Sequence, residues 1–318
     1  MKQDDVVQFI EHSKLENLLL QEGVTDISFN GRSFFVMSNS QGRRAVDVDM
    51  KPLEVGSFLR QIANMSEKQF SFSNPILDIS FGKYRLNAVF PSIARICNQK
   101  TWTFSLRLES KECLIKEGSD FFLPDSEKIL TGALLKKWSI VIGGKTSTGK
   151  TELQKWLLSQ MPSSTRVIVI DNVEELDMVD NPLLDLSNWL VDDGGKFSNF
   201  EVLIRNALRN NPDYILLAES RGKETFDAIS SAMSGHPIIT TIHAKGLEEM
   251  PRRMAKMALR AHQGLSSVDI LEDIKEHFEV FVYLIKKEID GRIVRQIESL
   301  GVMNPKTGQF EQVLRRKE

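Results

Sequence analysis

The sequence predicts an α/β protein in which a small α+β domain precedes a larger α/β domain. A chain of 318 residues is long enough for about two domains that each bury a core. In the first third, short segments of alternating apolar and polar residues predict an antiparallel sheet with helices beside it. After residue 130, short and continuously apolar strands alternate with helices, which is typical of a mainly parallel sheet covered on both faces. We therefore expect an α+β domain over 1–112, a linker over 113–129 and an α/β domain over 130–318.

The elements of the first domain follow from apolar spacing and turn residues. Residues 4–23 have the spacing of one or two helices, and residues 53–65 have that of another. Asn30-Gly31 and Gly82-Lys83 are hairpin signals between alternating segments. The expected strands cover 25–30, 32–38, 45–49, 76–81, 84–90 and 101–108.

The second domain reads as a regular alternation of strands and helices. The expected strands cover 139–144, 166–172, 214–219 and 237–242. The expected helices cover 150–161, 200–210 and 223–233, and Ser198 with Glu201 has the spacing of a capping box at the second of them. Asp290-Gly291 predicts a terminal hairpin that joins strands over 280–289 and 292–300.

Composition excludes several classes of protein. The net charge of -2 gives no whole-molecule attraction to nucleic acid or anionic lipid. Cys97 and Cys113 can form neither a disulfide framework nor a metal cluster. The amino terminus lacks a signal-peptide pattern, and apolar runs such as 280–285 are too short to cross a bilayer. We expect a cytoplasmic protein that is at most peripheral at the inner face of the cell membrane, through its partners.

A phosphate-binding loop is the most specific motif in the chain. The segment GKTSTGKT matches G-x-x-x-x-G-K-[ST] at every fixed position, with a strand before it and a helix after it. Glycines let several backbone N–H groups converge on one phosphate, and the helix adds its positive end. Lys150 would reach the β- and γ-phosphates of ATP, and the Thr151 hydroxyl would bind Mg²⁺. The expected nucleotide-binding residues are Gly144, Lys145, Thr146, Ser147, Thr148, Gly149, Lys150 and Thr151.

Polar residues follow three successive strands of the expected parallel sheet. They are Asp171, with Glu174 and Glu175 just beyond, then Glu219, then His243. Ligands of open α/β sheets lie at the carboxyl ends of the strands, so these side chains are expected beside the phosphate loop. Glu219 would supply a carboxylate beside the Mg²⁺. His236 precedes the strand that His243 closes, and an odd offset along a strand makes chelation of one metal ion by this pair improbable.

These segments together resemble the ATPases of type II and type IV secretion systems, which include the motors of conjugation and type IV pili. The matching segments are the phosphate loop, an "Asp box" VIVIDNVEEL, a Walker B segment ALRNNPDYILLAESRGKET and a "His box" SGHPIITTIHA. Order and spacing agree over about 130–246, whereas the first half resembles the family only in pattern.

The resemblance implies a RecA-like ATPase domain and a hexameric ring that binds ATP between the two domains of each subunit. Hydrolysis would move one domain against the other and drive a membrane-embedded secretion, conjugation or pilus machine. The catalytic residues implied are Glu219, Asp171, Glu175 and His243, with Thr151 and Glu219 at the metal. The resemblance assigns contacts with the nucleotide to Arg85 and Arg107, and Arg221 has a claim to a phosphate or ring-interface role.

The chain departs from the family pattern at several positions. Asp171 and Asn172 stand where a glutamate and an aspartate are usual, so slower hydrolysis is expected. Smaller departures are Ala218, Ser220, Ile238 and Glu152. The four-cysteine zinc motif of pilus-extension and type II members cannot be formed, which favours the compact type IV secretion branch.

Two other functions fit parts of the sequence. A RecA-like motor could act directly on nucleic acid through the basic stretch 252–260, although a solvated helix face is the commoner explanation and no aromatic residues are interleaved there. A nucleotide-gated assembly factor would bind ATP with little turnover. Arg205 and Arg209 could contact a neighbouring subunit or face solvent.

Overall fold

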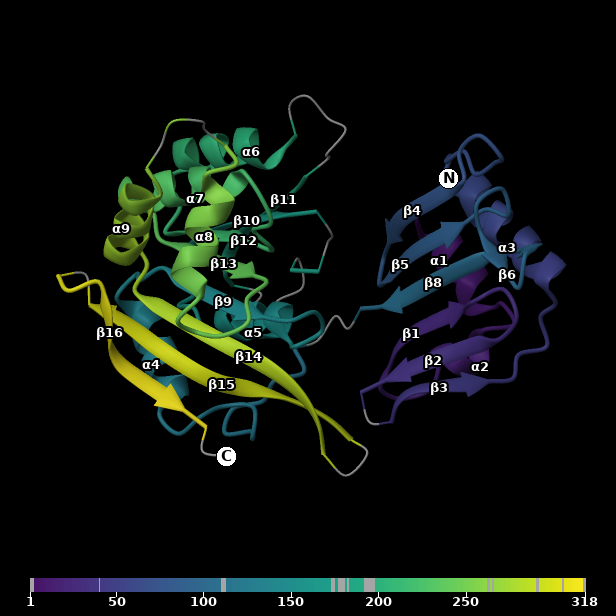
Figure 1. The fold of residues 1–318 in the computed structure, drawn as a ribbon, viewed down its shortest axis with the longest axis horizontal. Helices are drawn as coiled ribbons and strands as arrows, with labels where there is room; N and C mark the ends of the chain where they lie inside the picture. Colours follow the sequence, from purple (N-terminus) through teal and green to yellow (C-terminus); the bar gives the residue numbers. More distant parts are fainter. Residues whose placement is uncertain are drawn as a thin grey trace. The chain divides into compact units, whose positions relative to one another are not determined.

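The chain folds into two compact units in the computed structural model (Figure 1). The structure describes residues 3–39, 41–109, 113–172, 175–176, 181, 183–191, 198–261, 264, 266–289, 292–304 and 306–316. One unit comprises Met1–Ser110 with Glu288–Val294, and the other comprises Lys111–Lys287 with Arg295–Glu318.

The first unit is an antiparallel sheet with helices on one face (Figure 1). Its six strands are ordered β3-β2-β1-β8-β5-β4. They are β1 (Val24–Phe29), β2 (Phe34–Ser38), β3 (Gly42–Val46), β4 (Ile76–Phe81), β5 (Tyr84–Val89) and β8 (Thr103–Leu108), with a separate small hairpin of β6 (Arg95–Ile96) and β7 (Gln99–Lys100). The helices are α1 (Gln3–Glu11), α2 (Glu16–Leu19) and α3 (Pro52–Met65).

Alternation along the strands separates a packed face from an open face in this unit. Leu86 in β5 and Leu106 in β8 are fully buried in one cluster with Leu59 and Ile62 of α3. Arg85 and Arg107, next to them in sequence, lie on the other face.

The second unit contains an eight-stranded sheet ordered β11-β10-β12-β13-β9-β14-β15-β16. Strands β11 to β14 of this order pair in parallel, and β15 pairs with β16 in antiparallel fashion. The strands are β9 (Ile140–Gly144), β10 (Arg166–Asp171), β11 (Asp185–Leu190), β12 (Tyr214–Leu217), β13 (Ile238–Ile242), β14 (Val280–Ile289), β15 (Arg292–Asn304) and β16 (Gln309–Arg315).

Helices cover both faces of this sheet, as Figure 1 shows. Ile168 and Ile170 of β10 pack in a cluster with α6 to α9, whereas Val167 and Val169 pack in a second cluster with α4 and α5. The helices are α4 (Ser126–Leu135), α5 (Lys150–Ser159), α6 (Phe200–Ala207) with the 3₁₀ turn η1 (Leu208–Asn210), α7 (Glu224–Met233), α8 (Met250–Ala258) and α9 (Ser267–His277).

The α/β fold class predicted from the sequence is confirmed, and several details differ. The strand expected at 45–49 is β3, which begins at Gly42 because it pairs with β2 from Ser38 onward. The α6 cap is Asn199 rather than Ser198, since the Asn199 side chain accepts a hydrogen bond from the N–H of Val202. The sequence reading missed α4, α9, β11 and β16. The turn expected at Asp290-Gly291 lies outside the described residues.

The segment expected to be a linker packs on the second unit. Phe121, Phe122 and Leu123 are buried in the same cluster as Trp156 of α5, and α4 begins at Ser126. Within the described part of the chain, each helix is too short or too polar to span a membrane.

Candidate nucleotide-binding site

The phosphate loop joins β9 to α5 in a conformation that requires glycine. Gly149 adopts a φ of +94°, which side chains disfavour. A side chain at Gly144 would overlap Thr148 Oγ1 and lie 2.9 Å from the carbonyl oxygen of Leu284 in β14. Thr148 Oγ1 donates a hydrogen bond of 2.9 Å to the carbonyl oxygen of Lys145 and closes the loop on itself.

The loop presents its side chains unevenly. Lys145, Thr146 and Ser147 are exposed, whereas Gly149, Lys150 and Thr151 are half-buried and Gly144 and Thr148 are buried. Lys150 begins α5, and its Nζ lies 3.2 Å from the carbonyl oxygen of Lys145, to which it donates. The ammonium group therefore stands at the positive end of a helix, so its own charge and the helix dipole would both attract an anion.

Neighbouring parallel strands bring the predicted polar residues to the same sheet edge as this loop. The strands β10, β12, β13 and β9 are adjacent, and Asp171, Glu219 and His243 lie at or just beyond the carboxyl ends of β10, β12 and β13. His236 lies at the opposite end of β13, where its Nδ1 is 3.2 Å from Ser234 Oγ.

Glu219 is the centre of a charged cluster. Its Oε1 lies 3.0 Å from Nε2 of His243, and its Oε2 accepts a hydrogen bond of 2.6 Å from the guanidinium of Arg221. The other ring nitrogen of His243 is 3.3 Å from the carbonyl oxygen of Gly144, so the ring bridges Glu219 and the phosphate loop.

The positive charge of Lys150 also acts on Glu219. Burial raises the pKa of Glu219, but the Arg221 hydrogen bond and the charges of Arg221, His243 and Lys150 outweigh burial and hold that pKa below its ordinary value. The structure thus joins Glu219, His243, Arg221 and Lys150 in one electrostatic site.

The two acids expected from the Asp box differ in their settings. Asp171 is 3% exposed and ends β10, where its carbonyl oxygen accepts the N–H of Val191. Glu175 is half-buried, and its side chain makes no hydrogen bond or ion pair with another described residue.

Arg85 and Arg107 belong to the first unit. They are direct cross-strand partners in β5 and β8 on its open face. Each is without an ion pair to any residue in the described ranges. The pairing register of β5 and β8 brings these two arginines together, although they are 22 residues apart in sequence.

The remaining basic residues of interest lie on helix surfaces. Arg252, Lys256 and Arg260 of the α8 region are exposed, whereas Met254 and Met257 are buried. Arg205 forms ion pairs of 3.0 Å with Glu201 and 3.7 Å with Asp227, and Arg209 is exposed.

Two contacts of the loop and its helix were not anticipated from the sequence. Arg295 Nε in β15 donates a hydrogen bond of 2.9 Å to the carbonyl oxygen of Ser147. Gln154 of α5 is fully buried and donates to the carbonyl oxygen of Leu217, which anchors α5 to β12. Neither residue belongs to a motif, and only the order of strands and helices reveals the contacts.

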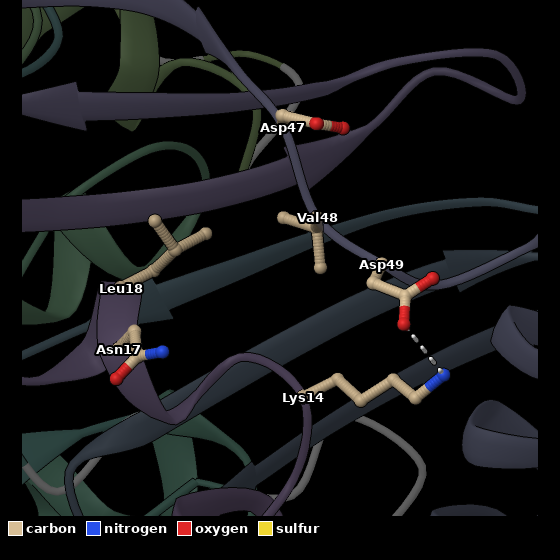
Figure 2. Close-up of a pocket in the computed structure, with 6 residues that line it drawn as sticks. All are labelled: Lys14, Asn17, Leu18, Asp47, Val48 and Asp49. Atoms are coloured by element: carbon tan, nitrogen blue, oxygen red, sulfur yellow. Dashed lines mark ion pairs between the residues drawn. The ribbon is translucent and has the colours of Figure 1, made fainter.

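A separate depression in the first unit is shown in Figure 2, with a volume of about 290 Å³. Lys14 lies at its edge, 4.0 Å from Asp49. Its lining contains none of the predicted site residues: Lys14, Asn17, Leu18, Asp47, Val48 and Asp49.

Comparisons with known structures place the fold. The VirB11 ATPase of the Brucella suis type IV secretion system, in complex with sulphate, is 26% identical, with a TM-score of 0.51, over 95% of this chain and 98% of that one. The pilus retraction motor PilT with bound ADP matches with a TM-score of 0.64 at 19% identity, over 96% of this chain and 84% of that one, and supports the fold alone.

Sequence comparisons identify the family. An uncharacterized protein of Bacillus anthracis is 30% identical over 302 residues, which are 91% of this chain and 66% of that protein. The type IV secretion system protein VirB11 of Brucella abortus is 36% identical over 161 residues, covering 49% of this chain and 43% of that protein. The model of the type II/IV secretion system protein family matches residues 107–275. The chain therefore belongs to this family and has VirB11-like relatives, although it spans less than half the length of the VirB11 protein of Brucella abortus.

Proposed function

We propose that the chain hydrolyses ATP in a Mg²⁺-dependent reaction and thereby drives a type IV secretion or conjugation machine. The observation that carries this proposal is the cluster of Glu219, His243 and Arg221 at the sheet edge that holds Lys150. A half-buried carboxylate kept ionised beside a phosphate loop is suited to orienting a water molecule toward a γ-phosphate.

The reaction assigned to this site is displacement at the γ-phosphorus. The water oxygen forms a bond to phosphorus while the bond to the β–γ bridging oxygen breaks, which yields ADP and inorganic phosphate. Glu219 orients the water, and Lys150 offsets the charge on the β- and γ-phosphates. His243 lies within reach of both Glu219 and the loop, so it would hold Glu219 in place or meet the γ-phosphate.

Further groups would complete the site. Asp171 ends β10 and Glu175 follows it four residues later, and one of these two acids would assist Glu219. Arg85, Arg107 and Arg221 would stabilise negative charge that develops on the phosphates, as arginines do in phosphoryl transfer.

The available side chains fit a magnesium ion. The Thr151 hydroxyl and the Glu219 carboxylate are hard oxygen donors, which is the ligand type that Mg²⁺ prefers. A bound Mg²⁺ would neutralise phosphate charge. Thr151 and Glu219 are both half-buried and supply only two protein ligands, so phosphates and water would complete the shell of the ion.

A hexameric ring acting with membrane-embedded partners is the assembly we propose. The VirB11-like relatives named as type IV secretion system proteins support a role at such a machine, at the cytoplasmic face of the membrane. Light scattering with a non-hydrolysable ATP analogue is expected to give six times the monomer mass. A monomeric mass with the analogue bound would contradict the ring.

Phosphate release tests the enzymatic proposal. The wild type is expected to release phosphate from ATP with Mg²⁺ and to stop when EDTA is added. Lys150→Ala is expected to abolish release because the phosphates lose their fixed counter-ion. ATP binding without any release by the wild type would instead identify a nucleotide-gated assembly factor.

A motor that acts directly on nucleic acid is the second candidate, because Arg252, Lys256 and Arg260 are exposed. The helix α8 carries no aromatic residue for base stacking, which disfavours this candidate. Stimulation of phosphate release by DNA, lost steeply with added salt, would favour it.

A further inference from the structure

We infer that Arg295 is a positioning residue that sets the phosphate loop in its anion-binding conformation. The inference rests on the proposed nucleotide site and adds to it a residue from the terminal strands, outside every motif of the sequence. Its basis is the hydrogen bond from Arg295 Nε to the carbonyl oxygen of Ser147, at 2.9 Å.

This bond fixes the orientation of one peptide group in the loop. A trans peptide is planar, so its C=O and the following N–H point in opposite directions. The described residues include no cis peptide. With the Ser147 carbonyl held toward Arg295, the N–H of Thr148 must point away from Arg295.

The N–H of Thr148 is the kind of donor that a phosphate requires. Among the described residues, none accepts a hydrogen bond from it, although Thr148 itself is 2% exposed. A buried N–H without an acceptor is costly, and a bound phosphate oxygen would satisfy it. Arg295 thus prepares the donor before the anion arrives.

The backbone conformation of Ser147 in the phosphate loop requires support from its surroundings. Ser147 adopts a φ of +60°, in the left-handed region that residues with a side chain disfavour. Such a conformation persists only when its surroundings hold it. The Arg295 hydrogen bond to the Ser147 carbonyl is a contact of this kind.

The strand that carries Arg295 is itself well anchored. The N–H of Ile297 donates to the carbonyl oxygen of Phe121, and the Arg316 guanidinium donates to the carbonyl oxygens of Asp120 and Phe122. The Phe122 ring packs on Trp156 of α5 at a centroid distance of 4.8 Å. The base of Arg295 is therefore fixed relative to the helix that follows the loop.

The side chain of Arg295 also lies beside Gly149 of the phosphate loop. Its Cδ would be 3.7 Å from a Cβ placed on Gly149, at ordinary contact distance. The aliphatic stem thus packs beside Gly149 while Nε reaches the carbonyl oxygen of Ser147.

Two substitutions separate the hydrogen bond from the charge. Glutamine places its Nε2 as many bonds from Cα as Nε of arginine, so Arg295→Gln keeps a donor at the same reach and removes the charge. Arg295→Lys keeps the charge but has a methylene at that place. Arg295→Ala removes both.

The test is titration of each full-length variant with the fluorescent nucleotide mant-ADP, together with kcat and KM for phosphate release. Arg295→Ala and Arg295→Lys are expected to raise Kd and KM about fivefold, the worth of one hydrogen bond, with little change in kcat. Arg295→Gln is expected to bind within about twofold of the wild type. Arg292→Gln, an exposed arginine earlier on the same strand, is the matched control and should leave Kd unchanged.

The outcomes distinguish this inference from the proposed function. Wild-type affinity in Arg295→Lys together with lost affinity in Arg295→Gln would overturn the inference in favour of charge alone. Wild-type affinity in Arg295→Ala would overturn it entirely. Failure of the wild type to bind mant-ADP, with a normal melting transition, would instead refute the proposed nucleotide site.

Discussion

The two units arrange their charged residues in opposite ways. At the edge of the parallel sheet, unlike charges meet: Glu219 contacts Arg221 and His243. On the open face of the antiparallel sheet, like charges meet, because Arg85 lies directly opposite Arg107. The first arrangement is paired within its own unit, whereas in the second Asp26 of β1, which lies directly opposite Arg107 on its other side, balances only one of the two cations. A net positive charge of this kind is what a binding surface for an anion would carry.

The largest effect is expected from a substitution that breaks the contacts of Glu219 with Arg221 and His243. Glu219→Gln is expected to lower kcat for phosphate release by about a thousandfold, since an amide cannot replace the carboxylate that orients water. Binding of mant-ADP should stay near that of the wild type because the phosphate loop is untouched. The control is Glu248→Gln, which removes another partly exposed carboxylate that is paired with an arginine, Arg315. Normal turnover in Glu219→Gln would remove this residue from the chemistry.

The second prediction addresses the like-charged pair. Replacing both Arg85 and Arg107 by glutamine is expected to lower kcat about a hundredfold if they stabilise phosphate charge. The same change should alter the free energy of unfolding by less than about 1 kcal/mol, because relief of the repulsion between the arginines offsets the lost attraction of Arg107 to Asp26. Activity would therefore fall while stability stays nearly constant, which phosphate release and urea unfolding can measure.

A control makes this result specific to the pair. Arg95→Gln removes an exposed arginine of β6 in the same unit and should change neither quantity. Full activity in the double variant would show that the arginine pair has no part in turnover.

The contrast also explains how much the sequence could predict. Continuous apolar strands identified the parallel sheet, and the glycine-rich motif identified the loop, because both signals are local. Strand β11 was missed, since it is an edge strand with the polar residues Ser187 and Asn188 in its centre. Arg295 was missed because its contact with Ser147 joins residues 148 positions apart, which only the strand order brings together.

The third prediction concerns the departure at the end of β10. Asp171→Glu is expected to preserve or raise kcat by a few fold, because it restores the longer acid usual in the family. Since Asp171 is 3% exposed, the added methylene should cost about 1–3 kcal/mol of stability. A collapse in kcat at an unchanged melting temperature would indicate that the surroundings are matched to the shorter acid.

The smallest expected effect is a change in the pH dependence of stability. The pKa of Glu219 lies below its ordinary value of 4.5, with burial opposing the effect of Arg221 and the other cations. A folded-state pKa below the unfolded one stabilises the protein above about pH 4.5, and this contribution is lost as the pH falls through the folded pKa. Arg221→Gln removes the main cation and should raise the pKa of Glu219. The free energy of unfolding should then fall less between about pH 5 and about pH 3 than in the wild type.

A double-mutant cycle assigns this change to the contact between the two residues. In a Glu219→Gln background the carboxylate is absent, so adding Arg221→Gln should leave the pH dependence unaltered. Urea unfolding at both pH values gives the four free energies that the cycle needs. An equal effect of Arg221→Gln in both backgrounds would place its influence on other acids, and the cluster at the sheet edge would then lose its electrostatic coupling.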